Sequence, residues 1–137
     1  MSELFVGFIP SLLEFLAFFS VAAVLTVIFI AIYSKTTRHE EIKLIKENST
    51  AAAAAFSGSL IGFALPLASV MLHSLSVIDL VLWGIVAMIV QIVVYFLVRM
   101  PMPRISERIE AGEVAAGIWL GAASLVAGIL NAASMAV

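Results

Sequence analysis

Four long apolar runs, each bounded by polar or charged residues, dominate the pattern of hydrophobic positions along the chain. A helix needs about 20 apolar residues to cross the hydrocarbon core of a bilayer. The runs that reach this length cover residues 12–33, 51–72, 80–98 and 114–136. The pattern predicts an all-α membrane protein, with residues 1–137 as a single four-helix transmembrane domain built from two helix–loop–helix pairs.

The two predicted pairs have a similar organisation. Each consists of a helix, a basic loop and then a helix rich in small residues, and the segments AAFSG (54–58) and GIWLG (117–121) fall at equivalent places. A weak parallel repeat, related by a pseudo-two-fold axis, would have this arrangement.

Small residues replace Leu and Ile along one face of the second and fourth runs. Helices in lipid associate mainly by close packing, which small side chains permit. Gly58 with Gly62, and Gly117 with Gly121, each form a GxxxG pair. These faces predict tight packing, either within one subunit or between the subunits of a homo-oligomer. The predicted helix-packing residues are Ala51, Ala55, Gly58, Gly62, Ser69, Gly117, Gly121, Ser124 and Gly128.

Composition favours the membrane interpretation and excludes several other classes. Hydrophobic residues make up 64% of the chain and charged residues 12%, whereas soluble domains have about 45–50% and 25%. There are no cysteines, which excludes disulfides and thiolate chemistry. A net charge of −2 argues against a nucleic-acid partner. The expected partners are the lipid bilayer and either further copies of the chain or another membrane protein.

The basic residues predict the orientation of the helices. All seven Lys and Arg residues lie in the first and third connections, and none lies near either terminus or in the second connection. The positive-inside rule then places the first and third loops in the cytoplasm and both termini outside. The first loop is expected to hold a short amphipathic helix capped by Thr37 and Glu40. Tyr33 and Tyr95 are expected near the membrane interfaces.

Two amides and one proline interrupt the apolar runs. Gln91 lies mid-run and Asn131 lies on the small face of the last run. Because unsatisfied amides are costly in lipid, both should point inward, to form interhelical hydrogen bonds or to line a hydrated path. Pro66 should bend its helix, as a static kink or as a hinge.

Three ionisable residues are placed at the outer rim by this topology: Glu14, His73 and Asp79. The simple interpretation is a headgroup-level acid, an interfacial ring and a residue in the first turn of a helix. The alternative is a cation entrance or a proton-sensitive latch.

Known catalytic motifs are missing from the sequence. It contains no phosphate-binding glycine loop, no HExxH and no nucleophile elbow. We therefore expect no enzyme activity, no cofactor and no metal site. Two functions stay open: a structural or assembly component that oligomerises through its small-residue faces, and an oligomeric channel or transporter for ions or small solutes.

The stretch IYSKTTRHEEIKLIKENSTAAAAAFSGSLIGFALPLAS, followed by Asp79, Trp83, Gln91 and the closing GILNAASM, resembles a known family. It is similar to the YjfL-like inner-membrane proteins of bacteria, classed as domain of unknown function 350. The resemblance implies a four-helix protein of the bacterial inner membrane and supplies no activity. The residues that match the family pattern are His39, Glu41, Asn48, Ser57, Gly58, Gly62, Pro66, Asp79, Gln91 and Asn131.

Overall fold

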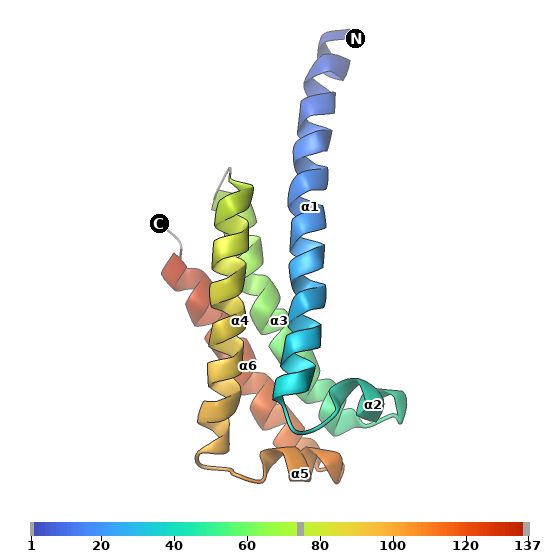
Figure 1. The fold of residues 1–137 in the computed structure, drawn as a ribbon, viewed down its shortest axis with the longest axis vertical. Coiled ribbons are helices and arrows are strands. Elements are labelled where there is room, and N and C mark those ends of the chain that lie inside the picture. The colour runs from blue at the N-terminus through green and yellow to red at the C-terminus, as the bar shows by residue number, and fades with distance from the viewer. Residues whose placement is uncertain (1, 74–75, 136–137) are drawn as a thin grey trace.

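The computed structural model describes residues 2–73 and 76–135, and every regular element in these residues is a helix (Figure 1). The elements in chain order are α1 (Ser2–Thr36), α2 (Glu41–Lys46), α3 (Thr50–His73), α4 (Val77–Arg99), α5 (Ile105–Glu110) and α6 (Val114–Met135).

Four of these helices, α1, α3, α4 and α6, are long and apolar enough to cross a membrane, which confirms the predicted all-α membrane fold. The short helices α2 and α5 lie at one end of the bundle, in the two connections that carry the basic residues (Figure 1). We call this the basic end, and the end where α3 stops at His73 and α4 begins at Val77 the opposite end.

Helices α3 and α6 form the most extensive contact in the molecule. Their small residues let the two backbones meet. Gly58 lies against the backbone of Gly121, and Gly128 lies against the backbone of Gly62. Gly117 packs on Ala51 in the same way. The small-residue faces noted in the sequence therefore meet each other within one chain.

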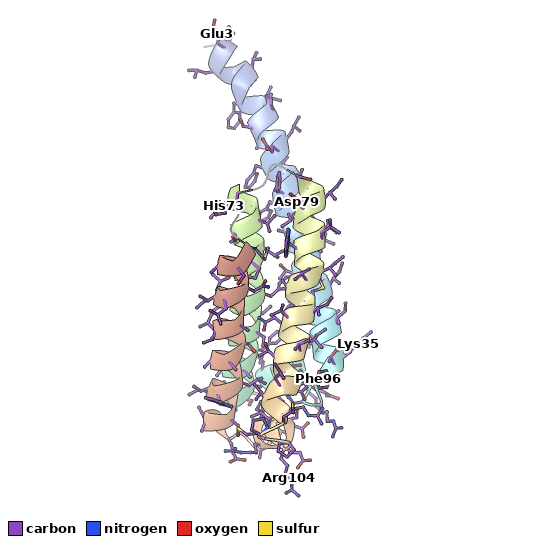
Figure 2. The ribbon with its side chains drawn as sticks, turned by 90° about the vertical axis from the view of Figure 1, so that its left-hand side faces the viewer. Glu3, Lys35, His73, Asp79, Phe96 and Arg104 are labelled. Atoms are coloured by element: carbon purple, nitrogen blue, oxygen red, sulfur yellow. The ribbon has the colours of Figure 1, made fainter. Side chains whose placement is uncertain are left out.

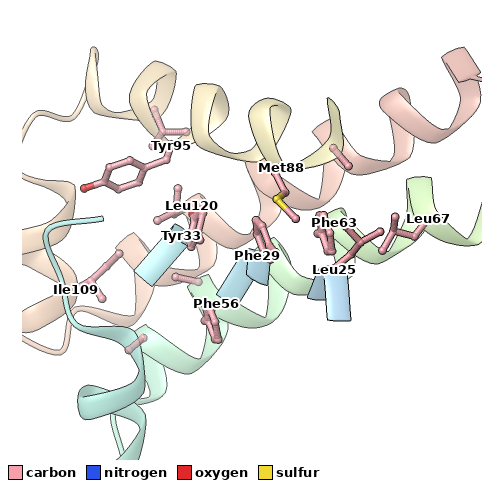
Figure 3. Close-up of a cluster of buried hydrophobic side chains, with 14 of the residues drawn as sticks. Leu25, Phe29, Tyr33, Phe56, Phe63, Leu67, Met88, Tyr95, Ile109 and Leu120 are labelled. Carbon is pink, nitrogen blue, oxygen red and sulfur yellow. The ribbon is translucent and has the colours of Figure 1, made fainter. Parts of the chain in front are cut away.

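Larger side chains from α1 and α4 complete the core around this pair (Figure 3). Phe29 of α1 stacks on Phe63 of α3 with ring centroids 4.3 Å apart. Gly84 of α4 lies beside the side chains of Leu25 and Leu67, so α4 approaches both α1 and α3 closely. Pro66 is buried inside α3, which continues through it.

Helix α1 extends well past the rest of the bundle. It has 35 residues, while α3, α4 and α6 have 24, 23 and 22. Glu3 lies far beyond the level of His73 and Asp79 at the opposite end (Figure 2). The helix begins at Ser2, ten residues before the predicted start of the first span, because its apolar residues continue through Gly7 and Pro10.

Candidate functional site

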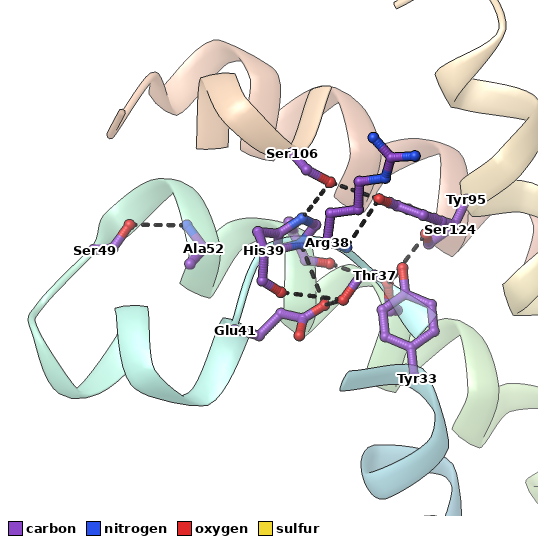
Figure 4. Close-up of polar contacts among 12 residues, drawn as sticks. Tyr33, Thr37, Arg38, His39, Glu41, Ser49, Ala52, Tyr95, Ser106 and Ser124 are labelled. Atoms are coloured by element: carbon purple, nitrogen blue, oxygen red, sulfur yellow. Dashed lines mark hydrogen bonds and ion pairs between the residues drawn. The ribbon is translucent and has the colours of Figure 1, made fainter. Parts of the chain in front are cut away.

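A group of buried polar side chains lies at the basic end, where the α1–α2 linker, α4 and α5 meet (Figure 4). We call it the cap network. Its members are Thr37, His39, Glu41, Tyr95 and Ser106. His39 and Glu41 are both 0% exposed, which is unusual for ionisable side chains. We therefore take the cap network as the candidate functional site of the protein.

The contacts of the cap network form a connected chain. His39 Nδ1 lies 2.9 Å from Ser106 Oγ, and His39 Nε2 lies 3.2 Å from Glu41 Oε1. Ser106 Oγ also lies 2.5 Å from Tyr95 Oη, which accepts a hydrogen bond from the Arg38 backbone N–H. These contacts join the α1–α2 linker, in the first connection of the chain, to α4 and to α5, which lies in the third connection.

The donors of this chain point in one direction when the proton of a neutral His39 is on Nε2. Tyr95 then donates to Ser106, and Ser106 donates to His39 Nδ1. His39 Nε2 makes no hydrogen bond among the described residues although it lies close to Glu41 Oε1, and Glu41 Oε1 accepts a hydrogen bond from the Thr37 hydroxyl. Glu41 Oε2 has no hydrogen-bond partner among the described residues.

A second group of buried polar residues lies deeper in the bundle, and we call it the serine cluster: Tyr33, Ser59, Gln91 and Ser124. Ser59 Oγ lies 2.9 Å from Tyr33 Oη and 3.2 Å from Ser124 Oγ. Gln91 Nε2 donates to the Ser124 carbonyl at 3.0 Å, while its Oε1 has no partner among the described residues. The rings of Tyr33 and Tyr95 meet edge to face and link the two groups.

The core becomes apolar between the serine cluster and the opposite end. Phe29, Phe63 and Met88 fill the next layer, and Leu67 and Leu80 follow. Among the described buried side chains, the hydrogen bonds of the serine cluster reach Gln91 and do not continue through this layer. Asn131 lies farther along α6, with a buried Nδ2 that has no partner among the described residues.

The local sequence explains how the cap network is positioned. Asn48 adopts a positive φ of 67°, a conformation that Asn tolerates well, and this turn directs the chain from α2 into α3. The predicted capping pair is wrong: Glu40 makes no side-chain cap of α2, and Thr37 bonds to Glu41 instead.

The three rim residues come together only in part. Glu14 and His73 line one hollow of about 340 Å³ between α1 and the end of α3. The His73 ring donates to the Ser69 carbonyl at 2.8 Å. Asp79 lies in the first turn of α4, where its backbone N–H donates to Ser76 Oγ, and it does not line that hollow.

The other predicted residues are found on the α3–α6 interface or close to it. Ser69 Oγ donates to the Ala132 carbonyl of α6 at 3.4 Å, and Ala55 and Ser124 are buried. Within residues 2–73 and 76–135, no three His, Asp or Glu side chains gather as metal ligands do.

The sequence singles out Thr37, His39, Glu41 and Tyr95 for separate reasons and does not bring them together. Tyr33 and Tyr95 are buried in the bundle, at 1% and 0% exposure, and their hydroxyls bond to serines. Ser106 was not singled out at all. The sequence does contain a signal for its burial. Ser106 lies between Ile105 and Ile109 in the third connection, and both isoleucines are fully buried.

The fold and the buried polar groups define a multi-pass α-helical membrane protein. A sequence model of the family described as "Domain of Unknown Function (DUF350)" matches residues 7–135, so the chain belongs to this family. It is 45% identical over 127 residues to the UPF0719 inner membrane protein YjfL of Escherichia coli (strain K12), covering 93% of this chain and 96% of that protein.

A relative with lower sequence identity is also named as a membrane protein. The UPF0719 transmembrane protein YshE of Bacillus subtilis (strain 168) is 28% identical over 112 residues, covering 77% of this chain and 81% of that protein. No solved structure matches the chain. The chain is thus a multi-pass inner membrane protein of a family whose names state no activity.

Proposed function

We propose that this protein is a non-catalytic assembly component of the inner membrane that associates with further copies of itself. One observation carries the proposal. The first third of α1 is mostly apolar and is covered by no other described part of the chain, with Leu4 79%, Phe5 66% and Val6 68% exposed. Glu3 lies far beyond His73 and Asp79 (Figure 2), so the rest of the bundle leaves this apolar surface open to lipid or to a further helix.

The surface proposed for association differs from the one that the glycine pattern suggested. The small-residue faces of α3 and α6 are occupied by each other, as the contact of Gly58 with Gly121 illustrates. An oligomer must therefore use other surfaces. The buried position of His39 and Glu41 supports a non-catalytic role, because no substrate has access to side chains at 0% exposure.

The oligomeric state of the purified protein tests this proposal. Native mass spectrometry from lipid nanodiscs should give a dimer or a larger assembly as the main species. A monomer at every protein concentration would rule the proposal out.

We also propose that the basic end faces the cytoplasm and that both termini face the periplasm. The seven-to-zero distribution of Lys and Arg supports this orientation. In a chain without native cysteines, Lys43→Cys should resist a membrane-impermeant thiol reagent in intact cells, and Glu3→Cys should react. The reverse labelling pattern would contradict the orientation.

A channel or transporter is the second candidate. The observation in its favour is the pair of buried amide atoms without described partners, Gln91 Oε1 and Asn131 Nδ2. The apolar layer around Phe29 and Phe63 separates the serine cluster from the opposite end, which is why we rank this candidate second. Flux of protons or monovalent cations into proteoliposomes, abolished by Gln91→Leu, would reverse the ranking.

A further inference from the structure

The end of α4 places one cation beside an apolar groove at the basic end of the bundle. The groove has a volume of about 450 Å³ and is lined by Val93, Phe96, Leu97, Arg99 and Met100. The four apolar side chains are exposed, and the arginine is partly buried. We call this hollow the α4 groove. Its lining combines one positive charge with an apolar surface.

The sequence places this cation at the boundary of the membrane. Residues 80–98 include no charged side chain, so Arg99 is the first charge after the apolar run. Phe96 lies near the level of Lys35, which is in the last turn of α1 (Figure 2). Basic side chains at the end of a span lie at the level of the lipid headgroups. Val93 is six residues back along the helix, about 9 Å deeper in the membrane.

Two aromatic rings hold the guanidinium at the edge of the groove. The central carbon of the Arg99 guanidinium lies 5.8 Å from the centroid of the Tyr95 ring and 5.7 Å from that of the Phe96 ring. Tyr95 is fully buried, and its hydroxyl lies in hydrogen-bond contact with Ser106, so this ring is fixed. Cation–π attraction acts on the charge and leaves the five N–H donors of an arginine in need of acceptors.

No carboxylate among the described residues supplies those acceptors. The other two arginines of the third connection, Arg104 and Arg108, lie 4.0 Å and 3.3 Å from carboxylate oxygens of Glu107 and Glu113. Within residues 2–73 and 76–135, Arg99 forms no ion pair. An external anion that presents two oxygens fits its donors, and a phosphate group has that shape.

We propose that the α4 groove binds one phospholipid with an anionic headgroup. The phosphate accepts hydrogen bonds from Arg99, and the first part of an acyl chain lies along Phe96 and Val93. A zwitterionic headgroup brings its own ammonium to the phosphate and competes with the guanidinium, so a headgroup with net negative charge is favoured.

The other apolar groove of the bundle provides a contrast. It lies between α1 and α3, and its described lining, which includes Phe19, Thr26 and Ala64, has no charged side chain. That groove offers a lipid phosphate no partner, whereas the α4 groove does. The proposed lipid site goes beyond the proposed self-association and does not depend on it.

Lipid binding to the purified protein tests the site. Native mass spectrometry from detergent micelles, after titration with phosphatidylglycerol or with phosphatidylcholine of the same acyl chains, gives the affinity for the first bound lipid. Phosphatidylglycerol should bind at least about fivefold more tightly than phosphatidylcholine. Arg99→Gln should weaken phosphatidylglycerol binding at least about tenfold, because it removes charge-assisted hydrogen bonds. Arg99→Lys, which keeps the charge without the planar fork, should give an intermediate loss.

Lys35→Gln is the matched control. It removes the same charge near the same level of the membrane, but the Lys35 side chain is exposed and lies over no ring among the described residues. We expect a change of less than about twofold. Equal losses in Lys35→Gln and Arg99→Gln would show only the general attraction of a basic surface and would overturn the site. Equal affinity of the unmodified protein for the two lipids, or no bound lipid, would overturn it as well.

A second pair of variants tests the apolar part of the groove. Val93→Trp fills the groove, whereas Ile89→Trp adds the same ring one turn farther from Arg99, at an exposed position outside the lining. Val93→Trp should weaken phosphatidylglycerol binding at least about threefold, and Ile89→Trp should not. Circular dichroism confirms that each variant keeps its helices. Unchanged binding by folded Val93→Trp would show that no acyl chain lies in the groove, and the proposal would be wrong.

Discussion

At the scale of single residues, glycines set how closely α3 and α6 approach. A Cβ atom added at Gly58 would collide with the backbone of Gly121, and one added at Gly128 would collide with the backbone of Gly62. Backbone atoms cannot move aside as a flexible side chain can. A single methyl group at these positions therefore forces the helices apart.

The first prediction compares two glycines. Gly58→Ala should lower the free energy of unfolding by about 1–3 kcal/mol, the usual cost of overpacking a close contact. Gly7→Ala is the control, because nothing lies within 4 Å of a Cβ at that position. Unfolding in a denaturing detergent, followed by circular dichroism, gives both values. Equal effects of the two variants would be incompatible with the described interface.

The second prediction concerns the cap network. Ser106→Ala removes the hydroxyl that lies between His39 Nδ1 and Tyr95 Oη and leaves both atoms buried without it. We expect a loss of about 1–3 kcal/mol, with faster hydrogen exchange in α2 and α5. Ser134→Ala is the control, since that exposed serine bonds only to its own helix. Unchanged exchange in Ser106→Ala would show that the network does not hold the connections.

At the scale of elements, the turn between α2 and α3 depends on one backbone conformation. Asn48 has a φ of 67°, and Asn and Gly adopt this region far more readily than a β-branched residue.

The third prediction follows from this turn. Asn48→Gly should leave stability nearly unchanged, while Asn48→Val should cost about 1–2 kcal/mol through backbone strain. The same detergent unfolding assay measures both. A valine variant as stable as the glycine variant would contradict the left-handed turn.

Some elements could be predicted from the sequence because the determining pattern is local. The four long helices follow from run length, and the three-and-four spacing of Gly117, Gly121, Ser124 and Gly128 marks one helix face. The cap network could not be predicted in this way. His39 and Ser106 are 67 positions apart, and only the packing of two connections brings them together. The glycine spacing also could not decide whether its partner face lies in the same chain.

The length of α1 shows a different limit of sequence patterns. The length of the apolar run predicts a first span that begins at residue 12. The helix nevertheless starts at Ser2. Pro10 removes one backbone donor, and this loss is tolerated on an exposed helix of 35 residues.

At the scale of the whole molecule, the α3–α6 pair is the centre on which α1, α4 and the two short helices assemble. This arrangement requires the two small-residue faces to meet inside one chain. If the faces of α3 and α6 met between chains instead, these two helices would form the contact between copies and α1 would not be needed for it.

A disulfide across this interface tests that claim most directly. Ser59 Oγ and Ser124 Oγ lie 3.2 Å apart. Because the chain has no cysteine, cysteines introduced at these two positions would be its only thiols. The double variant Ser59→Cys/Ser124→Cys, oxidised in membranes, should form a disulfide within single chains that migrate as monomers. A mixture of the two single variants should form no linked dimer through these positions. Efficient dimer formation in the mixture, with no internal disulfide in the double variant, would contradict the account.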